Sequence, residues 1–96
     1  MNIKELLKQK RDEILKIAAK HGAYNIRIFG SVARGEDTEG SDVDFLIQVG
    51  PDTSPWFPVG LILDLQDLLA CKVDIVTEDS LYWLLRRRIL KEAIPL

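Results

Sequence analysis

The sequence predicts a single α/β (α+β) domain over residues 1–96, built on a small mixed β-sheet of about three strands flanked by about four helices. The first observation behind this prediction is that segments with helical spacing of apolar side chains alternate with short apolar runs typical of strands. The second is the length of 96 residues, which suits one domain and allows one hydrophobic core without disulfides. The third is that the sequence shows no internal repeat, low-complexity tract or linker.

The N-terminal part of the chain predicts a helix followed by a strand. Residues 3–20 carry apolar side chains at helical spacing, with lysines and acids between them, and Gly22 follows as a helix stop. Residues 24–29 mostly alternate apolar and polar positions, which is typical of a strand. Gly30 ends this strand.

The middle of the chain predicts a second strand between two loops. Residues 31–35 can form only a short helical turn, and residues 36–41 are polar and form a loop. Residues 42–49 contain a run of large apolar side chains and are predicted as a mostly buried strand. Residues 50–58 hold several prolines, which exclude a helix interior or a central strand.

The C-terminal part predicts a helix, a third strand and a last helix. Residues 59–70 have a wide apolar face interrupted by one narrow polar face, which favours a helix packed on a sheet. Residues 72–77 form a short apolar strand, and residues 78–93 have an amphipathic helical pattern that Pro95 cannot continue. The predicted order is therefore α-β-α-β-α-β-α.

Composition excludes several classes of protein. Thirteen basic and fifteen acidic residues give a formal net charge of −2, so the chain has no overall basic surface for duplex nucleic acid. The single cysteine, Cys71, rules out an internal disulfide framework and fits a reducing compartment. No apolar run approaches the roughly 18 residues of a membrane span, and no signal-peptide pattern is present. We therefore expect a small cytoplasmic protein that does not bind a membrane.

Three aspartates are the main candidates for chemistry. Asp42 and Asp44 are two residues apart in a predicted strand, so their side chains lie on the same face. Asp74 stands inside a short apolar strand, where an unpaired charge is costly. Three carboxylates on neighbouring strands repel one another unless a cation lies between them, and hard oxygen ligands suit Mg²⁺. Taken alone, Asp42 could simply be a turn or cap residue.

A glycine-serine turn is the second candidate element. Gly30 at a strand end allows the backbone to approach a ligand closely, and Ser31 opens a helical turn whose N–H groups suit phosphate. Arg34 can add hydrogen-bond donors, although an arginine in this position is often only solvated. The turn is not a Walker A loop, because Glu36 stands where that motif requires lysine. If the first two strands pair antiparallel, Gly30 and Asp42 meet at one edge of the sheet.

These two elements together resemble the motif of the polymerase-β-like nucleotidyltransferase superfamily. Its minimal branch, the minimal nucleotidyltransferase (MNT) domains, carries G-S-x-A-R-G followed by S-D-x-D. Here the first motif stands at residues 30–35 and the second at residues 41–44. Asp74 matches the third carboxylate of the superfamily, on a later strand. The resemblance covers about residues 24–77 and implies the polymerase-β-like nucleotidyltransferase fold.

The resemblance also implies a role for each motif residue. Asp42 and Asp44 would hold two Mg²⁺ ions, and Asp74 would join one ion and help activate the attacking hydroxyl. The Gly30–Ser31 turn would bind the β and γ phosphates of a nucleoside triphosphate, with help from Arg34. The reaction would be in-line attack on the α-phosphorus with pyrophosphate leaving.

Stand-alone MNT domains resemble antitoxins that pair with HEPN-family ribonuclease toxins and transfer AMP from ATP to a toxin tyrosine. The resemblance therefore implies protein AMPylation with a HEPN toxin as partner. Two alternatives stay open: an antitoxin that neutralises its toxin by binding alone, and nucleotidyl transfer to a small-molecule acceptor. The base preference, the acceptor residue, the number of AMP units and the oligomeric state also stay open.

Several other residues are expected to have structural rather than chemical roles. His21 is expected to be a helix-end residue, and Asp64 to face solvent. Trp56 lies in the proline-rich loop, where packing onto the core is the usual fate of an aromatic side chain. Of Tyr82 and Trp83, one is expected in the core and the other exposed.

Overall fold

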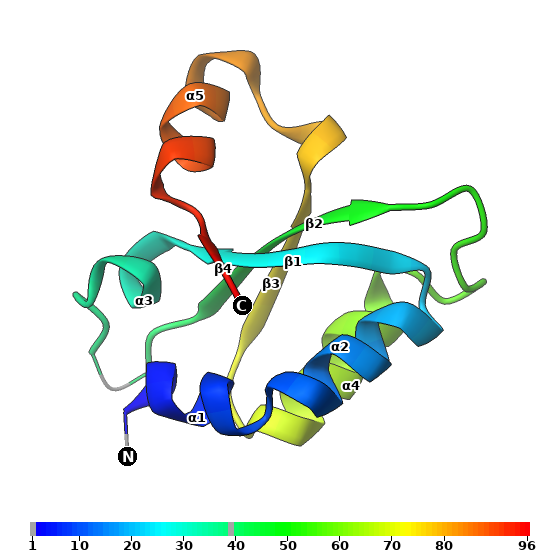
Figure 1. Cartoon of the computed structure of the whole chain (residues 1–96), viewed down its shortest axis with the longest axis horizontal. Coiled ribbons are helices and arrows are strands. Elements are labelled where there is room, and N and C mark those ends of the chain that lie inside the picture. Colours follow the sequence, from blue (N-terminus) through cyan, green and yellow to red (C-terminus); the bar gives the residue numbers. More distant parts are fainter. Residues whose placement is uncertain (1, 39) are drawn as a thin grey trace.

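The computed structural model describes residues 2–38 and 40–96; Met1 and Glu39, the latter within the predicted loop 36–41, lie outside the described residues. Helices and strands alternate as predicted, and the sheet has the strand order β3-β2-β1-β4 (Figure 1). The bounds of the elements are α1 Ile3–Gln9, α2 Arg11–Lys20, β1 Ala23–Phe29, α3 Gly30–Arg34, β2 Val43–Val49, α4 Val59–Leu69, β3 Val73–Thr77, a 3₁₀ turn η1 Glu78–Ser80, α5 Trp83–Glu92 and β4 Ile94–Pro95.

The sheet is mixed, as predicted. Strands β1 and β2 pair antiparallel, and β2 pairs parallel with β3 through the crossover helix α4. Helices α1, α2 and α4 lie along one side of the sheet, whereas α5 lies on the other side, above β1 and β2 in Figure 1. We call the first side the core face and the second the α5 face.

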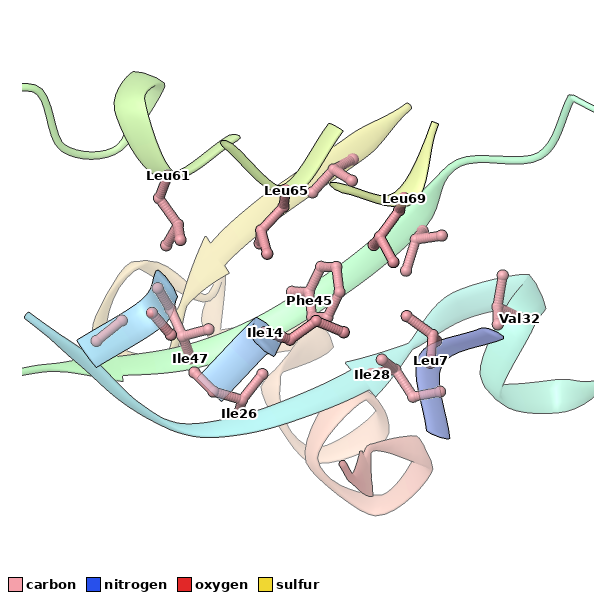
Figure 2. Packing of buried hydrophobic residues seen from close by; sticks show 14 of the residues in the cluster. Leu7, Ile14, Ile26, Ile28, Val32, Phe45, Ile47, Leu61, Leu65 and Leu69 are labelled. Atoms are coloured by element: carbon pink, nitrogen blue, oxygen red, sulfur yellow. The ribbon is translucent and has the colours of Figure 1, made fainter. Parts of the chain in front are cut away.

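The core lies between the sheet and the helices of the core face (Figure 2). Alternate residues of β2, namely Val43, Phe45 and Ile47, are buried there against Leu65 of α4 and Ile14 of α2. Burying one such side chain contributes about 1.5–3 kcal/mol. Because side chains alternate along a strand, this packing turns the intervening residues of β2 toward the α5 face.

The predicted single helix over residues 3–20 is wrong in one respect, because it breaks at Lys10 into α1 and α2. Leu7 and Ile14 are both buried, but the residues between them are all polar. With no apolar side chain in the intervening turn to hold it to the sheet, the chain bends there. Arg11 at this bend instead donates from Nε to the carbonyl oxygen of Leu96, at 3.0 Å.

The predicted helix over residues 78–93 also differs from the structure. Residues 78–80 form a 3₁₀ turn, the backbone at Leu81 and Tyr82 is extended, and the α-helix begins only at Trp83. The Ser80 hydroxyl donates to the carbonyl oxygen of Thr77 at 2.9 Å, which satisfies the end of β3 with a local turn instead of a helix.

A fourth strand, β4, was not predicted. Ile94 and Pro95 pair antiparallel with β1, opposite Ile28 and Arg27. Proline is tolerated at this position because β4 is at the edge of the sheet, where one side of the strand makes no ladder hydrogen bonds.

Within the described residues, no helix combines the length and the apolar character needed to cross a membrane.

Candidate active site

The glycine-serine turn and the first aspartate strand meet, as predicted from antiparallel pairing. Phe29, the last residue of β1, lies opposite Asp44 in the β1–β2 register. Gly30 follows with φ +78°, and a Cβ atom at this position would overlap the Asp44 carboxylate. The backbone angle therefore favours glycine, and a larger residue would also push the Asp44 carboxylate aside.

The aspartates of neighbouring strands are also in register. Asp44 of β2 and Asp74 of β3 are directly paired across the parallel ladder, so their side chains share one face of the sheet. Burial raises the pKa of Asp44 above its usual value, and the negative charges of Asp74, Asp42 and Glu92 raise it further, against a smaller opposing effect of Arg34. The predicted carboxylates thus lie close enough to repel one another, which is the situation that a bound cation relieves.

The donor chemistry of this face fits a divalent cation. Carboxylate oxygens are the ligands that Mg²⁺ prefers, and Asp74 is exposed while Asp42 and Asp44 are half-buried. Within residues 2–38 and 40–96, no three Asp, Glu, His or Cys side chains already converge as a ligand cage. The register brings Asp44 and Asp74 side by side, and Asp42, just before the start of β2 and not within it as predicted, acts on Asp44 through its negative charge.

The turn after β1 is anchored in the hydrophobic core by side chains of α3. In α3, Val32 and Ala33 are buried in the core, and Gly35 ends the helix with φ +74°. The N–H groups of the first turn of a helix have no partner within that helix and suit an anion. The Ser31 side chain makes no hydrogen bond within the described part of the chain, so its hydroxyl can serve a ligand.

Arg34 lies beside this turn, as predicted, but the structure pairs it with two carboxylates. Its Nη1 atom is 2.6 Å from Oε1 of Glu92, and its Nε atom is 3.0 Å from Oε2 of Glu36. These hydrogen bonds, the one to Glu92 foremost, raise the pKa of Arg34 above its usual value. The guanidinium is therefore oriented by protein contacts before any ligand arrives.

Glu92 was missed by the reasoning from sequence. It belongs to α5, far from either motif, yet its Oε2 atom accepts a hydrogen bond of 2.8 Å from the Gly30 N–H. One signal could have indicated it: Glu92 is an acid in the last turn of a basic helix, where the helix dipole disfavours negative charge. Such a residue is expected to have a specific partner elsewhere.

A second polar cluster lies at the opposite end of β1. His21 is buried; its Nδ1 atom is 2.6 Å from Ser54 Oγ and its Nε2 atom is 2.7 Å from Asp64 Oδ2. Asp64 keeps 41% of its side chain exposed, as expected, and its hydrogen bond with His21 lowers its pKa. The cluster joins the end of α2 to the proline-rich loop and to α4, and we interpret it as structural.

The aromatic side chains differ from expectation. Tyr82 and Trp83 are both exposed, so neither joins the core. In the proline-rich loop, Phe57 packs against the core as expected, whereas Trp56 is 76% exposed. Two large aromatic surfaces, Trp56 and Trp83, are thus open to solvent.

Comparison with known proteins shows what this chain is similar to. A family model described as a nucleotidyltransferase domain matches residues 4–96. A Methanocaldococcus jannaschii protein named as a candidate protein adenylyltransferase is 40% identical over 94 residues, which cover 98% of this chain and 97% of that protein. The protein adenylyltransferase MntA of Thermococcus cleftensis is 33% identical over 79 residues, covering 82% of this chain and 80% of that protein.

Solved structures give the same fold. A candidate minimal nucleotidyltransferase aligns with a TM-score of 0.85 and 44% identity, over 96% of this chain and 94% of that chain. A toxin–antitoxin complex with AMP-PNP aligns with a TM-score of 0.73 and 21% identity, over 88% of this chain and 69% of that chain. The second likeness shows the fold alone.

Proposed function

This chain belongs to the family of nucleotidyltransferase domains and is a nucleotidyltransferase; from that premise we propose that it transfers AMP from ATP to a hydroxyl group of a partner protein, with Mg²⁺ as its cofactor. The observation that carries the proposal is the meeting of Asp44 with the Gly30 turn, with Asp74 in register beside it. It supports the proposal because a turn that suits phosphate beside a cluster of carboxylates is what a metal-bound triphosphate needs.

Each residue has a defined task in the proposed reaction. Asp42, Asp44 and Asp74 are the candidate ligands of two Mg²⁺ ions, which when bound would supply positive charge to the attacking and leaving oxygens. Ser31 and Arg34 would hold the phosphate groups that leave. The acceptor oxygen forms a bond to the α-phosphorus while the bond to the bridging oxygen breaks, and pyrophosphate departs. Asp74 would assist loss of the proton from the acceptor hydroxyl.

For the acceptor, we propose a tyrosine of a HEPN-family ribonuclease toxin, so that the chain acts as an antitoxin. Support comes from the relatives named protein adenylyltransferase, one of them MntA, and from the likeness of fold to a toxin–antitoxin complex. ATP and Mg²⁺ are both cytoplasmic, and so we propose this location for the reaction.

The experiment that tests this function incubates the chain with ATP labelled at the α-phosphate, Mg²⁺ and a HEPN-family toxin encoded beside it. We expect label on the toxin, lost when EDTA removes the metal. The Asp42→Asn/Asp44→Asn variant should transfer label about a thousandfold more slowly, because metal charge at a phosphoryl group contributes several kcal/mol to transition-state stabilisation. No transfer by the unmodified chain, or undiminished transfer by the variant, would contradict catalysis.

A second candidate function is neutralisation of the toxin by binding alone. It is favoured by the exposed indoles of Trp56 and Trp83, which are 76% and 73% exposed and could contact a partner. The Asp42→Asn/Asp44→Asn variant separates the two functions. If it protects cells from the toxin at the same dose as the unmodified chain, binding suffices; if protection is lost while the complex still forms, catalysis is required.

A further inference from the structure

Helix α5 reaches the candidate site through one side chain, Glu92. Its carboxylate accepts the Gly30 N–H at 2.8 Å on one oxygen and the Arg34 Nη1 donor at 2.6 Å on the other. The two donors belong to the first and last residues of α3. One carboxylate therefore spans the whole turn that follows β1.

Hydrophobic packing accounts only in part for the position of Glu92: Ile89 and Leu90 are half-buried, and β4, which follows α5, pairs with β1. None of the residues of α5 is buried. Near the other end of the helix, Arg86 donates to the carbonyl oxygen of Glu78 at 2.9 Å. Polar contacts near both ends of α5 add to this attachment, and the contact at its C-terminal end is made with the candidate phosphate-binding turn.

The electrostatic balance favours Glu92 staying on this turn. Burial acts to raise the pKa of Glu92, but the hydrogen bonds from Arg34 and Gly30 and the charge of Arg34 outweigh it, and the pKa lies below its usual value. Glu92 is consequently ionised at neutral pH, and its donors hold it more strongly than water would. An arriving phosphate would have to displace a well-held carboxylate if it needed the same two donors.

Other donors are available to a phosphate without displacing Glu92. Arg34 has five N–H donors, and its two carboxylate partners engage Nη1 and Nε. The Ser31 hydroxyl, which makes no hydrogen bond within the described part of the chain, lies on the same short segment. A turn whose backbone and guanidinium are fixed in advance binds an anion with less loss of conformational freedom.

We propose that Glu92 is a positioning residue of the phosphate-binding turn: it fixes Gly30 and Arg34 so that Ser31 and the remaining donors of Arg34 face the triphosphate tail of the nucleotide. This inference rests on the proposed function and adds to it a residue outside both sequence motifs. The chemical class of ligand is a nucleoside triphosphate, recognised through its phosphates.

The test measures binding of ATP and of inorganic tripolyphosphate, each with Mg²⁺, to three forms of the chain. Glu92→Gln keeps the size of the side chain and removes its charge, and we expect about tenfold weaker binding of both probes, from the loss of charge-assisted hydrogen bonds. Glu36→Gln is the matched control, because Glu36 bonds the same guanidinium but is 65% exposed against 16% for Glu92. Its affinities should stay within about twofold of the unmodified chain. In steady-state transfer, Glu92→Gln should raise KM for ATP more than it lowers kcat.

A double-mutant cycle shows whether Glu92 acts through Arg34. In an Arg34→Ala background, Glu92→Gln should weaken ATP binding by much less than in the unmodified chain. Unchanged affinity of Glu92→Gln would overturn the proposal, and so would tighter binding, which would mark Glu92 as a competitor of the phosphate.

A readout without nucleotide keeps this inference separate from the proposed function. The backbone N–H of Gly30, followed by NMR, should shift and exchange with solvent faster in Glu92→Gln, and change little in Glu36→Gln. If the unmodified chain bound ATP but transferred no AMP, the proposed function would fail while the positioning role stood. If the Gly30 signal did not respond to Glu92→Gln, the positioning role would fail whatever the activity.

Discussion

Helices α4 and α5 are nearly equal in length, with 11 and 10 residues, but they serve the molecule in different ways. Helix α4 buries Leu61, Leu65 and Leu69 against the core face of the sheet, whereas α5 buries none of its residues. The exposed side of α5 carries Trp83, and its last turn carries Glu92 to the candidate site. We infer that α4 stabilises the fold, whereas α5 serves mainly to bring Glu92 to the candidate site.

Matched leucine substitutions give the largest expected contrast in stability. Leu65 of α4 is 2% exposed and Leu84 of α5 is 58% exposed. Leu65→Ala should lower the free energy of unfolding by about 3 kcal/mol, because it removes buried methyl groups and leaves a cavity. Leu84→Ala should change it by about 0.5 kcal/mol or less. Urea unfolding followed by circular dichroism measures both, and similar losses for the two variants would contradict the division of roles.

Removing the hydrogen bonds that join His21 to α4 is expected to have an intermediate effect on stability. His21→Ala removes a buried side chain that bonds Ser54 in the proline-rich loop and Asp64 in α4. It should therefore lower the free energy of unfolding by about 2 kcal/mol. Nucleotide binding should be unaffected, because His21 is at the end of β1 away from Gly30. Lys20→Ala is the control, since Lys20 is exposed and lies 3.9 Å from the same carboxylate. A loss of ATP affinity with unchanged stability in His21→Ala would show that this cluster serves the site instead.

The smallest expected effect concerns the pH dependence of stability beneath α5. Burial, followed by the charges of Asp74 and Asp42, raises the pKa of Asp44 above its usual value of 3.8. Between this value and the raised pKa the folded chain binds more protons than the unfolded chain, so stability falls as pH rises through that window. Without metal, Asp44→Asn should therefore have a higher Tm than the unmodified chain at pH 7, and the difference should shrink toward pH 3.

Thermal unfolding in EDTA at a series of pH values measures this difference. Leu84→Ala serves as the control, because Leu84 does not ionise. A lower Tm for Asp44→Asn at pH 7 would mean that the ionised carboxylate stabilises the metal-free fold, contrary to the electrostatic repulsion described above. Addition of Mg²⁺ should raise the Tm of the unmodified chain and leave that of Asp44→Asn nearly unchanged, provided that binding is to the folded state.

The features that the sequence predicted correctly are those set by residues close together in the chain. The three main strands, α4 and the loop with several prolines were predicted because apolar periodicity and proline act over a few residues. The break at Lys10 also had a local signal, the polar stretch between Leu7 and Ile14. It was missed because the apolar residues on both sides keep helical spacing across the whole segment. The fourth strand, β4, had no such signal, because the two residues Ile94 and Pro95 are too few to show the alternation typical of a strand.

Some features of the candidate site follow from the sequence alone. Strand alternation predicts Asp42 and Asp44 on one face, although β2 begins only at Val43, and a glycine after β1 permits the positive φ of Gly30. Tertiary structure alone decided that Asp74 is paired with Asp44, that His21 bonds Asp64, and that Glu92 holds a turn 62 residues before it. The physical reason is that periodicity and backbone preference act between near neighbours in the chain. A carboxylate's partner, by contrast, is chosen by which donors the packed sheet and helices bring within hydrogen-bond distance.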